Sequence, residues 1–312
     1  MTLAILCAGQ GWQGPDMFAL TGEAPEASHL FACGAKLLGG SDPRHYVRTE
    51  TSEAIHRDRA GQILCTIQAL AAASALREAL PKRIIVAGYS VGEVAAWGVA
   101  GLFGMTDTLE LVARRADAMD AATQPGDGLL FIRGLSRPGV DRLCERQEAA
   151  VAIVNPGDAF VLGGGRVALQ AIAGEAKAKN AAKVIVLPVA VASHTRRLTR
   201  ASAAFRESLR QVSVKFSPAS GTRVLSGIDG APVVRVDVGL DKLAAQISQT
   251  VQWASCLEGC IEAGATAFLE LGPGSALSKM VAGAYRDVPT RSLDDFKTLG
   301  GARAWLARLV DR

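Results

Sequence analysis

The segment Gly88-Tyr89-Ser90-Val91-Gly92 places a serine in a sharp turn between two regular elements. The run RIIVA at 83–87 predicts a buried strand before the turn, and EVAAWGVAGL at 93–102 predicts a helix after it. In this context the pattern G-x-S-x-G forms a nucleophile elbow, because the glycines permit a strained backbone and leave the serine hydroxyl exposed. We therefore predict that Ser90 is a nucleophile. The alternative is a glycine-lined turn with an incidental serine.

Composition indicates a globular chain with an α/β core. The 312 residues correspond to about two units at roughly 150 residues per domain. Hydrophobic residues make up 49% and aromatic residues 5%, and there are 33 glycines, so we expect a core of small and branched side chains in closely packed layers.

Charge and cysteine usage exclude several classes of function. The net charge of +4 is scattered along the chain, which argues against nucleic-acid binding and favours anionic partners such as a phosphorylated cofactor or an acidic carrier protein. The six cysteines include no CxxC pair, so we expect no metal site. The start MTLAILCAGQ lacks a basic signal-peptide region, and no run of about 20 apolar residues follows, so we expect a cytoplasmic protein.

Periodicity predicts a discontinuous large unit at 1–125 and 191–312 and an inserted small unit at 126–190. The small unit has the order β-α-β-β-α-β, which is the ferredoxin-like arrangement. Together with the elbow, this predicts an α/β-hydrolase-like core with an inserted ferredoxin-like subdomain.

Within the large unit, an apolar strand at 2–7 leads into the glycine-rich loop AGQGWQG. An alanine-rich helix is expected at 62–80, ending before Pro81. Asp107, with Glu110 three residues later, predicts a capped helix that runs to about Ala122.

A serine nucleophile needs a base, and the chain has four histidines. His194 alone follows an apolar run, VIVLPVAVAS, and precedes a helical pattern, so we predict that it lies at the end of a buried strand and opens a helix. A helix N-terminus lowers the pKa of an imidazole and keeps it neutral, as a general base requires. The alternative is a histidine that only caps the helix.

Two adjacent arginines differ in their helical neighbours. Arg114 has acidic residues at i−4 and i+3, which indicates an exposed face, whereas Arg115 is flanked by Leu111, Val112 and Met119. An arginine on an apolar face is either a snorkelling residue or a buried receptor for a carboxylate. The spacing leaves both readings of Arg115 open.

Six segments together resemble the malonyl-CoA:acyl-carrier-protein transacylase family in order and spacing. They are AGQGWQG at 8–14, GYSVGE at 88–93, the arginine at 115, VASH at 191–194, VQW at 251–253 and ELGPG at 270–274. Within the family, the GYSVGE elbow and the segment VNPGDAFVLGG are most similar to the epsilon subunit of bacterial malonate decarboxylase.

The resemblance implies a role for each matching position. Ser90 is expected to be the nucleophile, His194 the base and Arg115 the receptor for the free malonyl carboxylate. The backbone N–H groups of Gln10 and Val91 are expected to form the oxyanion hole, and the main-chain carbonyl of Gln252 to orient His194. No permanently bound cofactor is implied, since malonyl-CoA is the substrate.

Three further positions are expected near the acyl pocket: Tyr89, Asn155 and Ser193. Tyr89 stands where the family usually has His, and Ala8 replaces a usual Pro. The tetrapeptide VASH carries the small Ser193, so selectivity between malonyl and methylmalonyl groups stays open.

The partner implied is an acyl carrier protein, most specifically the carrier subunit of malonate decarboxylase. Arg196, Arg197 and Arg200 follow His194 and are candidates to contact CoA phosphates or an acidic carrier, or they form an ordinary solvated face. The alternatives are a malonyl transacylase of general fatty-acid synthesis, a serine esterase or thioesterase, and a non-catalytic subunit that binds carriers.

Overall fold

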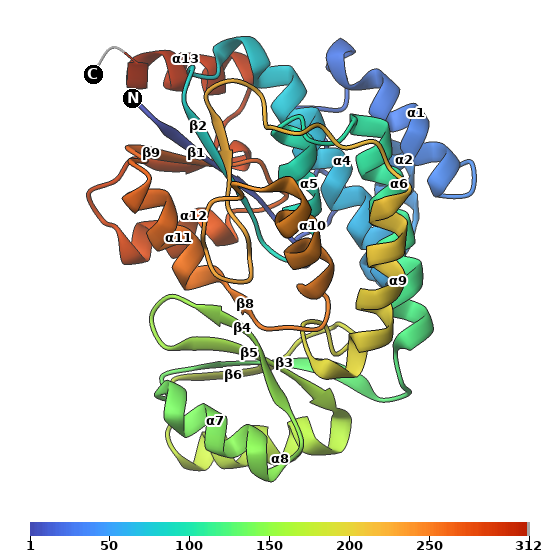
Figure 1. The fold of residues 1–312 in the computed structure, drawn as a ribbon, viewed down its shortest axis with the longest axis vertical. Coiled ribbons are helices and arrows are strands. Elements are labelled where there is room, and N and C mark those ends of the chain that lie inside the picture. Colours follow the sequence, from blue (N-terminus) through green and yellow to red (C-terminus); the bar gives the residue numbers. More distant parts are fainter. Residues whose placement is uncertain (311–312) are drawn as a thin grey trace.

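The computed structural model describes residues 1–310 and contains two five-stranded sheets. The sheet of the larger body, called the large sheet here, has parallel strands only (Figure 1). The strand order is β10-β9-β1-β2-β7, with bounds Leu3–Cys7 (β1), Ile84–Gly88 (β2), Thr222–Val224 (β7), Ala267–Glu270 (β9) and Thr290–Ser292 (β10). The central strand β1 is buried along its whole length, which explains why it is continuously apolar rather than alternating.

Helices pack on both faces of this sheet. Leu3 and Ile5 point into a cluster with residues of α4 (Asp58–Leu76), α5 (Gly92–Val99) and α6 (Met105–Ala122). Ala4 and Leu6 point the opposite way, toward α11 (Trp253–Glu262) and α12 (Ala276–Ala284). The other α-helices of this body are α1 (Ser28–Leu37), α2 (Pro43–Thr49), α3 (Ser52–His56), α9 (Thr199–Arg210), α10 (Val236–Ala245) and α13 (Leu299–Val310).

The sheet of the smaller body, called the smaller sheet for that reason, also has five strands, in the order β6-β3-β5-β4-β8. Its bounds are Asp127–Arg133 (β3), Ala150–Asn155 (β4), Ala159–Gly165 (β5), Lys183–Val186 (β6) and Val251–Gln252 (β8), and α7 (Arg137–Arg146) and α8 (Arg166–Ala178) cover one face (Figure 1). The first four strands pair antiparallel, which is compatible with the expected ferredoxin-like arrangement. Its other face packs toward the large sheet through Leu129, Ile153 and Val161.

The strand β8 was not predicted. It comes from the 191–312 part of the chain, yet it pairs parallel to β4 in the smaller sheet. The two bodies therefore share a sheet, and Gln252 lies on that shared edge.

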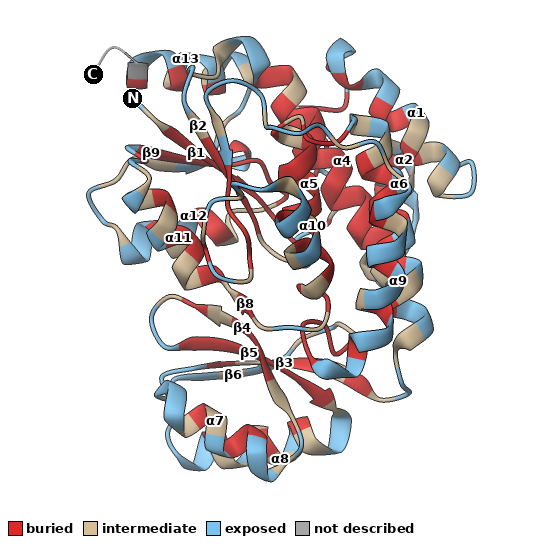
Figure 2. Cartoon of the chain, viewed as in Figure 1, coloured by how far each residue is buried: buried red, intermediate tan, exposed pale blue. Residues whose placement is uncertain are grey.

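The alanine-rich helix α4 explains the unusual composition. Nearly all of its residues are buried, and it packs against α1, α5 and α6 (Figure 2). Alanine lets helix axes approach closely, so this core needs few aromatic residues.

Two expectations about secondary structure are wrong in detail. The helix expected from Asp107 begins at Met105 with Gly104 as its N-cap, so Asp107 lies in the first turn and does not cap the helix. The strand β6 ends at Val186, and the chain up to Thr195 is irregular, so His194 lies in a loop. Only the end of this apolar segment is buried, at Val191, Ala192 and Ser193, whereas Pro188 and Ala190 are exposed.

The elbow has the strained geometry that its sequence predicts. Ser90 has φ 57°, in the left-handed region that a residue with a side chain rarely adopts. A Cβ at Gly88 would lie 2.0 Å from the carbonyl oxygen of Gly92, and a Cβ at Gly92 would lie 2.1 Å from that of Cys7. Only glycine at both positions allows α5 to start this close to β1 and β2.

No helix in the part of the chain that the structure describes is long and apolar enough to cross a membrane.

We expect Gly92→Ala to destabilise the protein by about 1–3 kcal/mol, the usual cost of overpacking a core, and to reduce reactivity at Ser90. The obstacle is backbone, since the new methyl group would meet the Cys7 carbonyl. Gly283→Ala is the matched control, because this exposed glycine of α12 has nothing within 4 Å of a built Cβ. Thermal unfolding measures both; equal melting temperatures for the two variants would contradict the prediction.

Candidate active site

The structure brings Ser90 and His194 together from positions far apart in the sequence. Ser90 Oγ lies 2.8 Å from Nε2 of His194, at the point where β2 ends and α5 begins. Both residues have left-handed backbones, with φ 57° for Ser90 and 61° for His194. Strain of this kind persists only where the surroundings impose it, and it is typical of functional sites.

The partner of His194 is the main-chain carbonyl of Gln246, not that of Gln252. His194 Nδ1 donates to the Gln246 carbonyl oxygen at 2.6 Å, and the His194 backbone N–H donates to Ile247 O at 2.8 Å. These carbonyls are available because α10 ends at Ala245, whereas Gln252 belongs to β8 and donates its N–H to Gly227 O. The expectation for Gln252 is therefore wrong, because the acceptor lies six residues earlier in the chain. No pattern of side chains marks a main-chain acceptor.

These contacts fix the tautomer of His194. A carbonyl oxygen can only accept, so Nδ1 carries the proton and Nε2 is left as an acceptor for the Ser90 hydroxyl. Burial, assisted by the positive charge of Arg115, lowers the pKa of His194 to about 3, while the Gln246 carbonyl acts in the opposite direction. Burial is therefore the main reason that the imidazole is neutral; the helical segment that follows begins at Arg196, two residues after His194.

Arg115 is buried, which decides against the snorkelling arrangement that its helical spacing left open. It is 1% exposed, and its Nη1 donates to Gln62 Oε1 at 2.6 Å and its Nη2 to Gln246 Oε1 at 3.3 Å. Burial lowers the pKa of the guanidinium to about 10, opposed by the charges of Asp58 and Glu93, so it is still charged at neutral pH. Arg114 is exposed, as predicted, and donates to Gln211.

The glycine-rich loop after β1 lies against the elbow. A Cβ at Gly9 would be 2.8 Å from the Tyr89 carbonyl oxygen, so the close approach requires glycine. The Gln10 side chain donates to Asp58 O at 3.1 Å, which anchors the loop. Within residues 1–310, neither the Gln10 N–H nor the Val91 N–H donates to a protein acceptor.

The three predicted pocket positions are near the elbow or the histidine. Tyr89 stacks edge-on against Trp253, with ring centroids 5.3 Å apart, and burial raises the pKa of its hydroxyl to about 12. Asn155 neighbours Tyr89, and its buried amide atoms lack a hydrogen-bond partner among the described residues. Ser193, next to His194, is buried.

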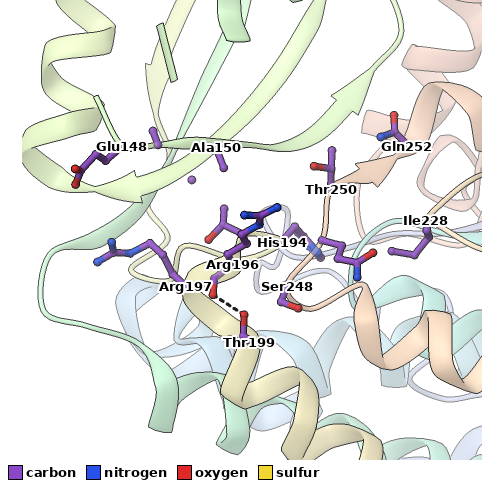
Figure 3. Close-up of a pocket in the computed structure, with 14 residues that line it drawn as sticks. Glu148, Ala150, His194, Arg196, Arg197, Thr199, Ile228, Ser248, Thr250 and Gln252 are labelled. Atoms are coloured by element: carbon purple, nitrogen blue, oxygen red, sulfur yellow. Dashed lines mark hydrogen bonds between the residues drawn. The ribbon is translucent and has the colours of Figure 1, made fainter. Parts of the chain in front are cut away.

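A cavity of about 860 Å³ leads from the surface to His194 between the two bodies (Figure 3). Arg196 and Arg197 line it, together with Thr250 and Gln252 from the segment around β8. Arg197 is already paired, since its Nε donates to Asp127 Oδ1 at 2.7 Å. Arg200 is exposed on α9 and is not part of this lining.

Four polar residues of the site were not predicted from the sequence: Gln62 and Asp58 on α4, Glu93 on α5, and Gln246 just after α10. Glutamine at 62 was visible as a polar residue in an apolar helical run, which is a signal of a buried contact. Gln246 has no such signal, because its role combines a main-chain carbonyl with a side-chain amide. In residues 1–310, no group of His, Cys, Asp and Glu side chains is arranged to hold a metal ion.

Comparison with known proteins shows the family of the chain. Residues 54–300 match the Acyl transferase domain family. The malonyl CoA-acyl carrier protein transacylase of Mycobacterium tuberculosis is 30% identical over 295 residues, covering 93% of this chain and 96% of that protein. The corresponding protein of Haemophilus influenzae is 25% identical and covers 97% and 98%.

Solved structures of the same kind superpose over nearly the whole chain. The acyl-carrier-protein S-malonyltransferase of Burkholderia pseudomallei gives a TM-score of 0.89 at 27% identity and covers 97% of this chain and 100% of its own. The M. tuberculosis structure gives 0.88 at 29% identity, covering 98% and 100%. The chain belongs to the acyl transferase domain family and, within it, is a relative of the malonyl CoA-acyl carrier protein transacylases.

Proposed function

We propose that this protein transfers a malonyl group from malonyl-CoA to the thiol of an acyl carrier protein through an ester on Ser90. The observation that carries the proposal is the 2.8 Å contact between Ser90 Oγ and a neutral His194 Nε2, in one hydrogen-bond network with the buried charge of Arg115. The names of the relatives supply the acyl group and the kind of acceptor.

In the first half-reaction, His194 Nε2 takes the hydroxyl proton as Ser90 Oγ attacks the thioester carbonyl. The Gln246 carbonyl, held by Nδ1–H, stabilises the imidazolium that forms. The free N–H groups of Gln10 and Val91 are placed to bind the oxyanion. The C–S bond then breaks, and the CoA sulfur leaves with the proton from His194.

In the second half-reaction, the carrier thiol gives its proton to His194 and attacks the ester. The bond between the acyl carbon and Ser90 Oγ breaks, and the proton returns from His194 to Ser90 Oγ, so the enzyme is restored. The cavity of about 860 Å³ that reaches His194 is the route proposed for both thiol arms, with Arg196 on its wall. Arg200 is exposed and is proposed to contact the surface of an acidic carrier.

Arg115 is proposed to bind the free carboxylate of the malonyl group. A guanidinium offers a planar fork of donors that matches a carboxylate, and its buried Nε has no partner among the described residues. An acetyl group would leave that buried charge unpaired, so the receptor selects malonyl over acetyl substrates.

The acceptor separates two versions of this function. The resemblance of the elbow and of the 154–164 segment to the malonate decarboxylase epsilon subunit favours the carrier subunit of that enzyme. A carrier of general fatty-acid synthesis fits the compared relatives equally well.

Incubation with malonyl-CoA is expected to add one malonyl group at Ser90, visible by intact-mass spectrometry and peptide mapping. Ser90→Ala is expected to abolish the adduct and to lower transfer by about 10⁴-fold or more, because the nucleophile is absent. An undiminished adduct on Ser90→Ala, or none on the wild type, contradicts the proposal and would favour a non-catalytic subunit. Rapid release of malonate to water without a carrier would favour an esterase.

Arg115→Ala is expected to lower the preference for malonyl-CoA over acetyl-CoA by about 100-fold, the effect of losing hydrogen bonds to a charged group. The readout is the ratio of the two kcat/KM values. Arg114→Ala is the matched control, since it removes the same charge from the exposed side of the same helix. Equal ratios in Arg115→Ala and wild type would refute the receptor role.

A competition assay identifies the acceptor. The malonylated enzyme is offered equal amounts of a fatty-acid-synthesis carrier and of the malonate decarboxylase carrier subunit with its own prosthetic arm. Preferential malonylation of the decarboxylase carrier is expected; preferential malonylation of the other carrier would support the general transacylase instead.

A further inference from the structure

The charge of Arg115 is held by two glutamines, each of which is backed by a carboxyl group. Gln62 accepts from Arg115 Nη1 at 2.6 Å and donates its amide to Asp58 Oδ2 at 2.8 Å. Gln246 accepts from Nη2 at 3.3 Å and donates its amide to the Glu93 carboxyl and to Ser90 O. These contacts form a hydrogen-bond network in which the groups follow one another in the order carboxyl, amide, guanidinium, amide and carboxyl.

This hydrogen-bond network keeps the guanidinium free of a direct ion pair. Among residues 1–310, no carboxylate oxygen lies within 4.0 Å of an Arg115 nitrogen. A carboxylate in direct contact would compete with the carboxylate of a substrate, whereas an amide carbonyl orients the donors and leaves the charge unneutralised. The orientation of the two amides is therefore essential, because only their oxygen atoms can face a donor.

The two amides are fixed in different ways. The Gln246 amide donates to Ser90 O at 3.1 Å, and a main-chain carbonyl accepts at every pH, so this amide stays in place whatever the state of Glu93. Within residues 1–310, the acceptors of the Gln62 NH₂ group are the Asp58 carboxylate and, at 3.5 Å, the weak acceptor Met119 Sδ. Apart from the Arg115 donor on its oxygen, the direction of the Gln62 amide thus depends on Asp58.

We propose that Asp58 is a positioning residue for acyl selectivity: as a carboxylate it keeps the Gln62 carbonyl facing Arg115, and as a neutral group it lets the amide turn over. A protonated carboxyl can donate to Gln62 Oε1, and the Gln62 NH₂ would then face the guanidinium, donor against donor. The inference rests on the proposed function, since it concerns how the carboxylate receptor is held.

Asp58 is placed to exchange protons with solvent. It lines a second cavity of about 590 Å³ with Gln10 and residues 188–191. Burial raises the pKa of Asp58 to about 6; the Gln62 and Gln10 contacts and Arg115 act against this, and Asp120 of α6 adds to it. The other titratable groups on the cavity wall are Glu53, His56 and Arg57. Below about pH 6 the group is therefore neutral, and above it a carboxylate.

The test is the ratio of kcat/KM for malonyl-CoA to that for acetyl-CoA, measured from pH 8 to pH 5. The titration of His194 and any loss of active protein affect both substrates and cancel in the ratio. In the wild type the ratio is expected to fall by about tenfold as the pH drops through about 6, the effect of weakening one hydrogen bond to a charged group. In Asp58→Asn the ratio is expected to be low already at pH 8 and to stay flat.

Asp120→Asn is the matched control, because Asp120 lines the same cavity and has no hydrogen bond to Gln62. It is expected to keep the wild-type ratio at pH 8. A ratio for Asp58→Asn within twofold of wild type at pH 8, or equal losses in the two variants, overturns the inference. A flat wild-type profile also overturns it, even if Asp58→Asn fails to fold.

Failure of this inference differs from failure of the proposed function. If the wild type forms no malonyl ester at Ser90, the function itself is refuted. If it forms the ester and prefers malonyl over acetyl, yet Asp58→Asn leaves the ratio unchanged, only the role of Asp58 is refuted.

Discussion

Arg115 is almost completely buried, and its guanidinium is stabilised in the protein interior without a direct ion pair. The desolvation of such a charge is costly unless its donors are paired, and two glutamine carbonyls accept from Nη1 and Nη2 while Nε is left without a partner among the described residues. One of these, Gln246, also holds His194 through its main-chain carbonyl. Arg115 and His194 are thus positioned by the same residue.

A second constraint acts on the backbone around Ser90. The glycines at 88 and 92 allow β1, β2 and the start of α5 to approach so closely that a single methyl group would collide with main-chain atoms. That approach holds Ser90 in its left-handed conformation and turns its hydroxyl toward His194. The alanine-rich packing of α4 against α5 and α6 extends the same principle, because small side chains bring Gln62 on α4 within reach of Arg115 on α6.

The local features of this site could be predicted because their signal is local. The elbow is recognised from glycines that flank a serine between a strand and a helix, and Arg115 from apolar neighbours at helical spacing. His194 was identified for the apolar run that precedes it and the helical pattern that follows; a helix does begin at Arg196, but only the end of the apolar run is buried, and that end is a loop rather than a strand. A short apolar run alone does not distinguish a packed loop from a buried strand.

The sequence by itself determined the order of elements, the elbow at Ser90 and the apolar helix face that carries Arg115, since each follows from neighbours within a few residues. Only the tertiary structure decided that Gln246 rather than Gln252 meets His194, that β8 joins the smaller sheet, and that Asp58 stands behind Gln62. The first two depend on where the chain after α10 passes between two sheets. The third depends on side-chain amides whose direction is set by whichever donor or acceptor lies opposite, and that partner comes from a distant part of the chain.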